Sequence, residues 1–151
     1  MDSYSQFIAK SRYARYIESA NKRETWKETV QRYMDFMVGH LESDVGHVVD
    51  SVTKNKVQNA IENLEVVPSM RAIMTSGKAL ARDNVAGYNC SYLPIDDPKA
   101  FDEAAYILLC GCGVGFSCEQ KYIEKLPEVP EKLFESETTI VVSDSKEGWA
   151  K

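Results

Sequence analysis

Apolar side chains follow helical spacing through the first half of the chain. In the clearest case, residues 30–41, they recur at steps of three and four and form one stripe. Thr25 and Glu28 just before it form a capping box, in which the hydroxyl accepts from the amide three residues on and the carboxylate reaches back. The pattern predicts helices over residues 4–20, from Thr25 to residues 39–42, and over residues 54–64.

From residue 88 to residue 118 the pattern predicts a strand, a helix and a second strand. The first strand alternates between two faces, which places Cys90 on one face and Asn89 on the other. Asp96 and Asp97 before a proline predict the helix start, with an aspartate as N-cap. A glycine-rich turn then opens the second strand. A strand, a helix of about a dozen residues and a strand are typical of a parallel crossover unit, so the predicted class is α/β.

Residues 68–77 predict a short helical turn that begins with a proline and stops at a glycine. Ser69 stands at its N-cap position, and Arg71 follows within the first turn. A helix start that combines exposed amides, a hydroxyl and a guanidinium suits a phosphate group. A plain N-cap and a surface cation explain the same two residues, and the sequence leaves both interpretations open.

The C-terminal part predicts an incomplete sheet. Residues 120–137 read as a polar connection, residues 138–142 as a short β-branched strand, and Asp144 with Glu147 as a capping box for a further helix. A sheet of the α/β class needs both faces covered, and nothing follows to cover this last strand. We therefore expect the chain to be a fragment of a longer protein.

Composition and charge narrow the range of partners. The chain has 151 residues and a net charge of -5, with lysines and arginines spread along it, so it offers no basic stripe to a nucleic-acid polymer. No leader pattern is present, and no apolar stretch approaches the roughly 20 residues of a membrane span. We expect a cytoplasmic protein whose partners include neither a nucleic-acid polymer nor a membrane.

The spacing of the cysteines argues against a metal site, and the position of the glycines argues against a dinucleotide-binding turn. The four cysteines contain no C-x-x-C pair and the two histidines lie far from them in sequence, so no metal site is expected. Gly111, Gly113 and Gly115 follow a helix and open a strand, the reverse of the order in a dinucleotide-binding turn. We interpret these glycines as points where a ligand or another backbone approaches closely.

Five motifs stand in order along the chain. They are Pro68-Ser69-Met70-Arg71-Ala72 with Gly77, Tyr88-Asn89-Cys90-Ser91, Gly113-Val114-Gly115-Phe116-Ser117, Leu126-Pro127-Glu128-Val129-Pro130, and Asp144-Ser145-Lys146-Glu147-Gly148-Trp149. Together with the earlier Arg23-Glu24-Thr25-Trp26, they resemble the N-terminal part of the adenosylcobalamin-dependent (class II) ribonucleotide reductases. The resemblance implies an α-helical N-terminal region, residues 1–77, followed by the first strands of a ten-stranded α/β barrel, residues 78–151, left incomplete.

The resemblance assigns the redox chemistry to Cys90. In that family a cysteine on the first barrel strand supplies half of the dithiol that reduces the ribose 2′-carbon, and Cys90 matches it. Two close thiols can give up the two electrons that this reduction needs, and the resulting disulfide can be reduced again by exchange. The partner cysteine, the thiyl-radical cysteine and the region that contacts adenosylcobalamin would lie beyond residue 151. Cys110, Cys112 and Cys118 depart from the family pattern and are expected to be buried small hydrophobes.

The resemblance also implies two nucleotide sites and several partners. The ribonucleotide substrate is expected at Ser69, Arg71, Asn89, Cys90 and Gly113, with the ribose held by the Asn89 and Cys90 backbone and the Gly113 amide. The deoxynucleotide effector is expected near Asp96 and Asp97. A thioredoxin-type reductant and the missing C-terminal reductase chain complete the set of implied partners.

Three hypotheses follow from these residues. The leading one is a piece of a ribonucleoside triphosphate or diphosphate reductase that is inactive alone and acts when joined by the rest of the chain. The alternative is a non-catalytic nucleotide-binding or assembly module derived from such an enzyme, and its nucleotide binding would not depend on Cys90. A cysteine-based metal module ranks last, because the spacing of paired ligands is missing.

Overall fold

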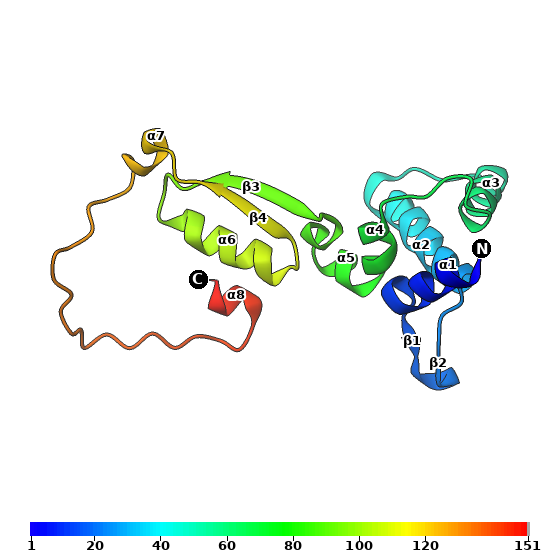
Figure 1. Cartoon of the computed structure of the whole chain (residues 1–151), viewed down its shortest axis with the longest axis horizontal. Helices are drawn as coiled ribbons and strands as arrows, with labels where there is room; N and C mark the ends of the chain where they lie inside the picture. The colour runs from blue at the N-terminus through cyan, green and yellow to red at the C-terminus, as the bar shows by residue number, and fades with distance from the viewer. Residues whose placement is uncertain (151) are drawn as a thin grey trace. The chain divides into compact units, whose positions relative to one another are not determined.

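The computed structural model describes residues 1–150, and the chain divides into two compact units. Unit 1 spans Met1–Gly87, and unit 2 begins at Tyr88. Figure 1 labels the helices and strands of both units. The boundary that was expected after residue 77 falls inside unit 1. None of the helices among the described residues is both long enough and apolar enough to cross a membrane.

Two helices form the core of unit 1. They are α2 (Trp26–His40), which continues into the π-helical turn η3 (Leu41–Val45), and α3 (Ser51–Glu62). Val30, Met34 and Ile61 are buried where the two helices pack, and Trp26, Tyr33 and Val38 close the cluster. The predicted end of the first helix near residues 39–42 is confirmed. The second begins at Ser51 rather than 54, because Asp50 caps it by accepting from the Thr53 amide at 2.9 Å.

The capping box at the start of α2 is confirmed. Thr25 Oγ1 accepts from the Glu28 amide at 3.3 Å, and Glu28 Oε2 accepts from the Thr25 amide at 2.7 Å. Hydrogen bonds from Lys22 first, and from Thr25 next, lower the pKa of Glu28 to about 2. The helix therefore begins with a charged carboxylate near its N-terminus, where the helix dipole favours negative charge.

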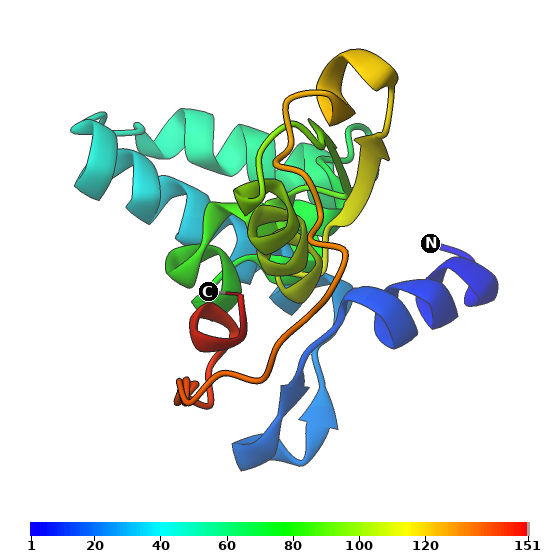
Figure 2. The same ribbon diagram turned by 90° about the vertical axis from the view of Figure 1, so that its left-hand side faces the viewer.

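The helix predicted over residues 4–20 is wrong in its second half. It ends with α1 (Ser3–Ile8) and the π-helical turn η1 (Ala9–Tyr13), and a small hairpin follows (Figure 2). β1 (Tyr16–Ile17) pairs antiparallel with β2 (Lys22–Arg23) around the short 3-10 helix η2 (Glu18–Ala20). The Arg15 amide donates to the buried Glu24 carboxylate at 3.1 Å, so a long-range hydrogen bond replaces the helical bond at this point.

A buried ion pair holds the hairpin, α2 and α4 (Met70–Thr75) together. The Arg32 guanidinium on α2 donates to both Glu24 oxygens, at 2.8 and 3.0 Å, and to the carbonyls of Ile73 at 2.9 Å and Ser76 at 3.0 Å. Thr29 Oγ1 also donates to Glu24 at 3.0 Å. Arg32 therefore satisfies carbonyls at the end of α4 that have no partner within the helix.

A short helix that the sequence did not predict follows a glycine. α5 (Lys78–Arg82) begins directly after Gly77 and leads into the 3-10 helix η4 (Asn84–Gly87), and both pack with α4. Gly77 has φ 102° and ψ -138°, a backbone conformation that residues other than glycine rarely adopt. A Cβ at Gly77 would also lie 3.2 Å from Arg15 Nη1. The predicted stop at Gly77 is a sharp turn between two helices.

Gly77→Ala is expected to lower the free energy of unfolding by roughly 1–3 kcal/mol, because it forces a side chain into this backbone conformation. Gly39→Ala is the matched control, since Gly39 lies within α2 with nothing near its added Cβ. That substitution should raise the free energy of unfolding by roughly 0.5–1 kcal/mol. Urea unfolding followed by circular dichroism measures both, and equal effects would contradict the role given to Gly77.

Unit 2 contains the predicted parallel crossover. β3 (Cys90–Pro94) and β4 (Gly113–Ser117) pair in parallel, and α6 (Lys99–Leu109) connects them along one face (Figure 1). The core consists of Leu93, Ile95 and Ala100, with Ala104, Ile107, Val114 and Leu126 packed against it. The chain is therefore a mixed helix-and-sheet protein, with a helical first unit and a strand-helix-strand second unit.

Two predictions for the C-terminal part are wrong. Residues 138–142 form no strand, because no neighbouring backbone pairs with them, and Ile140 and Val141 are exposed. The helix after them, α8 (Lys146–Trp149), is capped by Ser145, whose Oγ accepts from the Gly148 amide at 3.0 Å, and not by Asp144. The polar connection instead contains a further short helix, α7 (Gln120–Ile123).

Candidate functional site

Cys90 begins β3 on the face of the sheet that α6 leaves open. Its register partner across the parallel pair is Gly113, and Cys90 is exposed. A Cβ added to Gly113 would lie 4.0 Å from Cys90 Sγ, so the glycine leaves space directly beside the thiol. The same arrangement repeats two register pairs along, on the same face, where Gly115 lies opposite the exposed Tyr92.

The two faces of β3 differ as the alternation predicted. Cys90 and Tyr92 are exposed on the open face, whereas Leu93 is buried in the core that α6 covers. Ser91, also on the covered side, donates from Oγ to the Gly113 carbonyl at 3.1 Å and ties the two strands together. The open face can therefore receive a flat ligand against two glycines, with a thiol at one end and a phenol ring next to it.

The backbone at Asn89 and Gly113 is already engaged in the sheet. The Gly113 amide donates to the Asn89 carbonyl at 2.8 Å. A bound ribose would find that amide occupied, so what Gly113 offers a ligand is its missing side chain. The predicted hydrogen bond from the Gly113 amide stays a prediction, and the space beside Cys90 is the feature that the structure adds.

Ser69 and Arg71 lie in unit 1, at the start of α4. Ser69 Oγ accepts from the Ala72 amide at 3.4 Å, so Ser69 acts as the N-cap. Arg71 Nε donates to the Ala86 carbonyl at 3.0 Å, which ties α4 to η4. Both residues therefore have structural roles in the fold, and their binding of a phosphate stays a prediction.

Asp96 and Asp97 follow the carboxyl end of β3, at the opposite end of the strand from Cys90. Asp96 Oδ2 lies 3.0 Å from Lys125 Nζ, and Asp97 Oδ1 accepts from the Lys99 amide at 2.8 Å. Six residue-to-residue steps separate Cys90 from Asp96, which correspond to about 20 Å of extended chain. A ligand bound at Asp96 and Asp97 would therefore occupy a different site from a ligand bound beside the Cys90 thiol.

The other cysteines only partly match the expectation of buried small hydrophobes. Cys112 is 2% exposed, as expected. Cys118 is exposed, and Cys110 is half-buried with its sulfur 3.1 Å from Lys146 Nζ. The strand ends at Ser117, which leaves Cys118 beyond the covered face. Within residues 1–150 no group of three or more His, Cys, Asp or Glu side chains could hold a metal ion.

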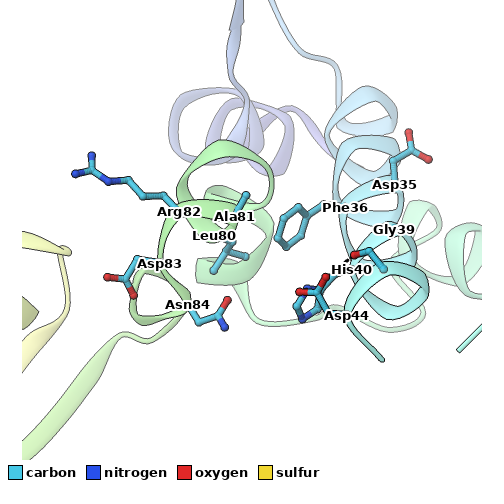
Figure 3. A pocket seen from close by; sticks show the side chains of 11 residues that line it. Asp35, Phe36, Gly39, His40, Asp44, Leu80, Ala81, Arg82, Asp83 and Asn84 are labelled. Atoms are coloured by element: carbon cyan, nitrogen blue, oxygen red, sulfur yellow. Dashed lines mark hydrogen bonds and ion pairs between the residues drawn. The ribbon is translucent and has the colours of Figure 1, made fainter. Parts of the chain in front are cut away.

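The structure also contains a cavity that the sequence did not indicate. It lies within unit 1 between the end of α2 and α5, has a volume of about 490 Å³, and includes Phe36 and Leu80 (Figure 3). The ring of His40 stacks on Phe36, and His40 Nδ1 lies 2.8 Å from Asp44 Oδ2. None of the predicted site residues lines this cavity. Its histidine and aspartate are already paired with each other, so we assign it no role in the proposed chemistry.

Comparison with known proteins supports the sequence motifs. No protein-family model matches the chain. Its sequence is 29% identical to the adenosylcobalamin-dependent ribonucleoside-triphosphate reductase of Lacticaseibacillus paracasei, over 93% of this chain and 22% of that protein. A solved structure of a B12-dependent (class II) ribonucleotide reductase shares the fold with a TM-score of 0.70 at 19% identity, over 95% of this chain and 28% of that one.

The two matches agree on how much of a reductase the chain represents. Each covers nearly all of this chain, and the chain spans less than a third of either relative. The resemblance predicted from the ordered motifs is therefore confirmed. Over nearly its whole length, this chain is similar to part of an adenosylcobalamin-dependent ribonucleotide reductase.

Proposed function

We propose that the chain is the N-terminal part of a ribonucleotide reductase, and that it forms deoxyribonucleotides only together with the rest of such an enzyme. The similarity to the ribonucleoside-triphosphate reductase over 93% of the chain is the observation that carries this proposal. In this proposal, β3 and β4 are the first strands of the ten-stranded barrel, and unit 1 is the helical region before it. The C-terminal part of the reductase supplies the remaining strands of the barrel.

Cys90 supplies one of two thiols in the proposed reaction. The ribose 2′-carbon exchanges its C–O bond for a C–H bond, the oxygen leaves as water, and two thiols become one disulfide. The carbon gains the two electrons that the thiols lose, so the reaction balances without a further reductant. A thioredoxin-type dithiol then reduces the disulfide by exchange and restores Cys90 for the next turnover.

The surroundings of Cys90 support this role. The thiol is exposed on the open face of the sheet, and Gly113 beside it has no side chain to block an approaching ribose. A sulfur that must alternate between a thiol and a disulfide with a distant part of the protein needs this access. Cys112, at 2% exposure, lacks it.

Adenosylcobalamin would supply the radical that starts the reaction. The cavity in Figure 3, at about 490 Å³, has the size that suits a drug-sized ligand rather than a corrinoid with its appendages. This cavity therefore does not fit the cofactor, and we assign cofactor binding to the part of the enzyme outside this chain. The contribution of this chain is to expose Cys90 and to leave space beside it.

Two nucleotide contacts complete the proposal. Ser69 and Arg71 at the start of α4 would contact the substrate, in addition to their bonds within unit 1. Asp96 and Asp97 would contact a deoxynucleotide effector at the carboxyl end of β3. Cys90 begins β3 and Asp96 follows its other end, so substrate and effector stay apart, as separate regulation of specificity requires.

Gly113→Ala is expected to leave the fold intact and to slow alkylation of Cys90 severalfold. The added Cβ would lie at ordinary contact distances, 3.5 Å from the Asn89 carbonyl and 4.0 Å from Cys90 Sγ, so it narrows the approach to the thiol without a clash. Iodoacetamide labelling followed by peptide mass spectrometry measures the rate. Cys118 in the same sample is the internal control, and an unchanged rate at Cys90 would contradict the space assigned to Gly113.

Reconstitution tests the proposed function. The purified chain is mixed with a C-terminal reductase part, adenosylcobalamin, a dithiol and a ribonucleotide, and deoxyribonucleotide is measured. Product that requires both parts supports the proposal. If a verified complex forms no product, but the chain alone binds deoxynucleotides and does so equally well after Cys90→Ser, the non-catalytic binding module is favoured instead.

A further inference from the structure

A second cavity in unit 1 lies where α1, η1, β2 and the first turn of α2 meet. Its volume is about 410 Å³, within the range of small-molecule sites. Lys10 from η1, Arg23 from β2, and Trp26 and Lys27 from α2 contribute to its wall. Three cations and one large aromatic ring therefore surround one cavity in a protein whose net charge is -5.

The cations of this cavity are only partly neutralised by the protein. The Lys10 ammonium has no hydrogen-bond or ion-pair partner among residues 1–150, and the Arg23 guanidinium donates one N–H to the Ala14 carbonyl at 3.1 Å. Lys27 is 78% exposed and lies 3.8 Å from Glu62 Oε2, a long contact that leaves most of its charge to solvent. Positive charge is therefore in excess at this site.

The acid that lines the cavity does not cancel this charge. Glu24 accepts hydrogen bonds from Arg32, Thr29 and the Arg15 amide, so its carboxylate is directed to these partners. Burial favours its neutral form, but the hydrogen bonds and charge of Arg32, with the other donors, outweigh burial and lower the pKa of Glu24. Glu24 is thus a charged but fully partnered group, and an anion in the cavity would meet Lys10, Arg23 and Lys27.

Trp26 gives the cavity a spectroscopic reporter and an apolar surface. Its indole N–H donates to the Glu62 carbonyl at 3.2 Å, which fixes the ring at the cavity wall. An arginine and two lysines beside a fixed aromatic ring match a ligand that carries adjacent phosphates, because guanidinium and ammonium groups bind phosphate oxygens with charge-assisted hydrogen bonds.

We propose that this cavity binds a small ligand bearing a diphosphate or triphosphate group, held by Lys10, Arg23 and Lys27. The site lies wholly in unit 1 and does not involve Cys90, Asp96 or Asp97. It is consequently independent of the proposed reductase chemistry, and its test can fail or succeed without deciding that proposal.

Fluorescence titration with pyrophosphate tests the site in the full chain. Trp149→Phe provides the background, because Trp26 is then the single tryptophan of the protein. Pyrophosphate at constant ionic strength is expected to change Trp26 emission saturably. Lys10→Glu should weaken the binding by about tenfold or more, the scale of one charge-assisted hydrogen bond.

Lys56→Glu is the matched control, since Lys56 is exposed on α3, lies outside the cavity and changes the net charge equally. Its affinity for pyrophosphate should equal that of the background protein. Adenosine triphosphate distinguishes the source of the phosphates: tighter binding than pyrophosphate assigns a nucleotide, and equal binding assigns the phosphate group alone. Absence of saturable binding by both fluorescence and calorimetry, or equal weakening by Lys56→Glu, would overturn the proposal.

Discussion

Cys90→Ser is expected to lower deoxyribonucleotide formation by the reconstituted reductase by roughly 10³-fold or more, the scale on which removal of a reacting group acts. A serine hydroxyl cannot form a disulfide, so the ribose 2′-carbon has no second electron donor. The loss should appear in kcat, because serine keeps nearly the size of cysteine and substrate binding at the open face changes little. Steady-state kinetics with a saturating dithiol measures both constants.

Cys118→Ser provides the matched control for this result. Cys118 is also exposed and lies in the same unit, but it follows the end of β4 and not the face that carries Gly113. Its replacement should leave kcat unchanged. Full activity of the Cys90→Ser complex, or an equal loss in both variants, would rule out Cys90 as the reacting thiol.

Arg32→Ala is expected to reduce the free energy of unfolding of unit 1 by roughly 3–5 kcal/mol. The Glu24 side chain is 8% exposed and the Arg32 side chain 17% exposed, so the change leaves a buried carboxylate without its main partner. It also removes donors from the carbonyls of Ile73 and Ser76 at the end of α4. Urea unfolding of the full chain, monitored by far-ultraviolet circular dichroism, measures the loss.

The same ion pair predicts how this effect depends on pH. The folded protein lowers the pKa of Glu24 below its ordinary value of 4.5, so the stabilisation is complete above that value and is lost as pH falls through the lower, folded pKa. The difference between the natural chain and Arg32→Ala should therefore be largest at neutral pH and shrink in acid. Arg12→Ala, at an exposed position, is the control and should change stability little. A pH-independent difference would contradict the role of the Glu24 charge.

The sequence predicts best where a local signal and the long-range packing agree. The capping box at Thr25 appears as expected, because it is closed by residues three apart. The alternation around Cys90 also appears as expected, because successive side chains of an extended strand point to opposite faces and α6 covers one of them. The parallel pairing of β3 with β4 was predictable as well, since a helix of this length between two short strands leaves few other connections.

Long-range contacts explain the parts that the sequence did not predict. The helix expected over residues 4–20 breaks where Glu24, Arg32 and the Arg15 amide meet, and no periodicity reports a contact between an acid and an arginine on another element. The strand expected over residues 138–142 has β-branched residues but no pairing partner, and propensity alone does not make a strand.

In the candidate site, too, the sequence predicted the residues, whereas their long-range contacts became known only from the structure. The motifs singled out Cys90 and Gly113, and the structure adds that the two residues are register partners, so the missing side chain of Gly113 leaves space beside the thiol. Two structural facts could not be read from the motifs. The Gly113 amide is already bonded to Asn89, and Arg71 is bonded to Ala86, because both bonds depend on how distant segments approach each other.

Disulfide mapping after a single turnover tests the central claim most directly. The complex of this chain with a C-terminal reductase part is reduced, freed of dithiol, given one equivalent of ribonucleotide, and then alkylated and digested for mass spectrometry. We predict a disulfide between Cys90 and a cysteine of the other part, in an amount equal to the deoxyribonucleotide formed. Product formation with Cys90 recovered entirely in its alkylated, reduced form would contradict the account.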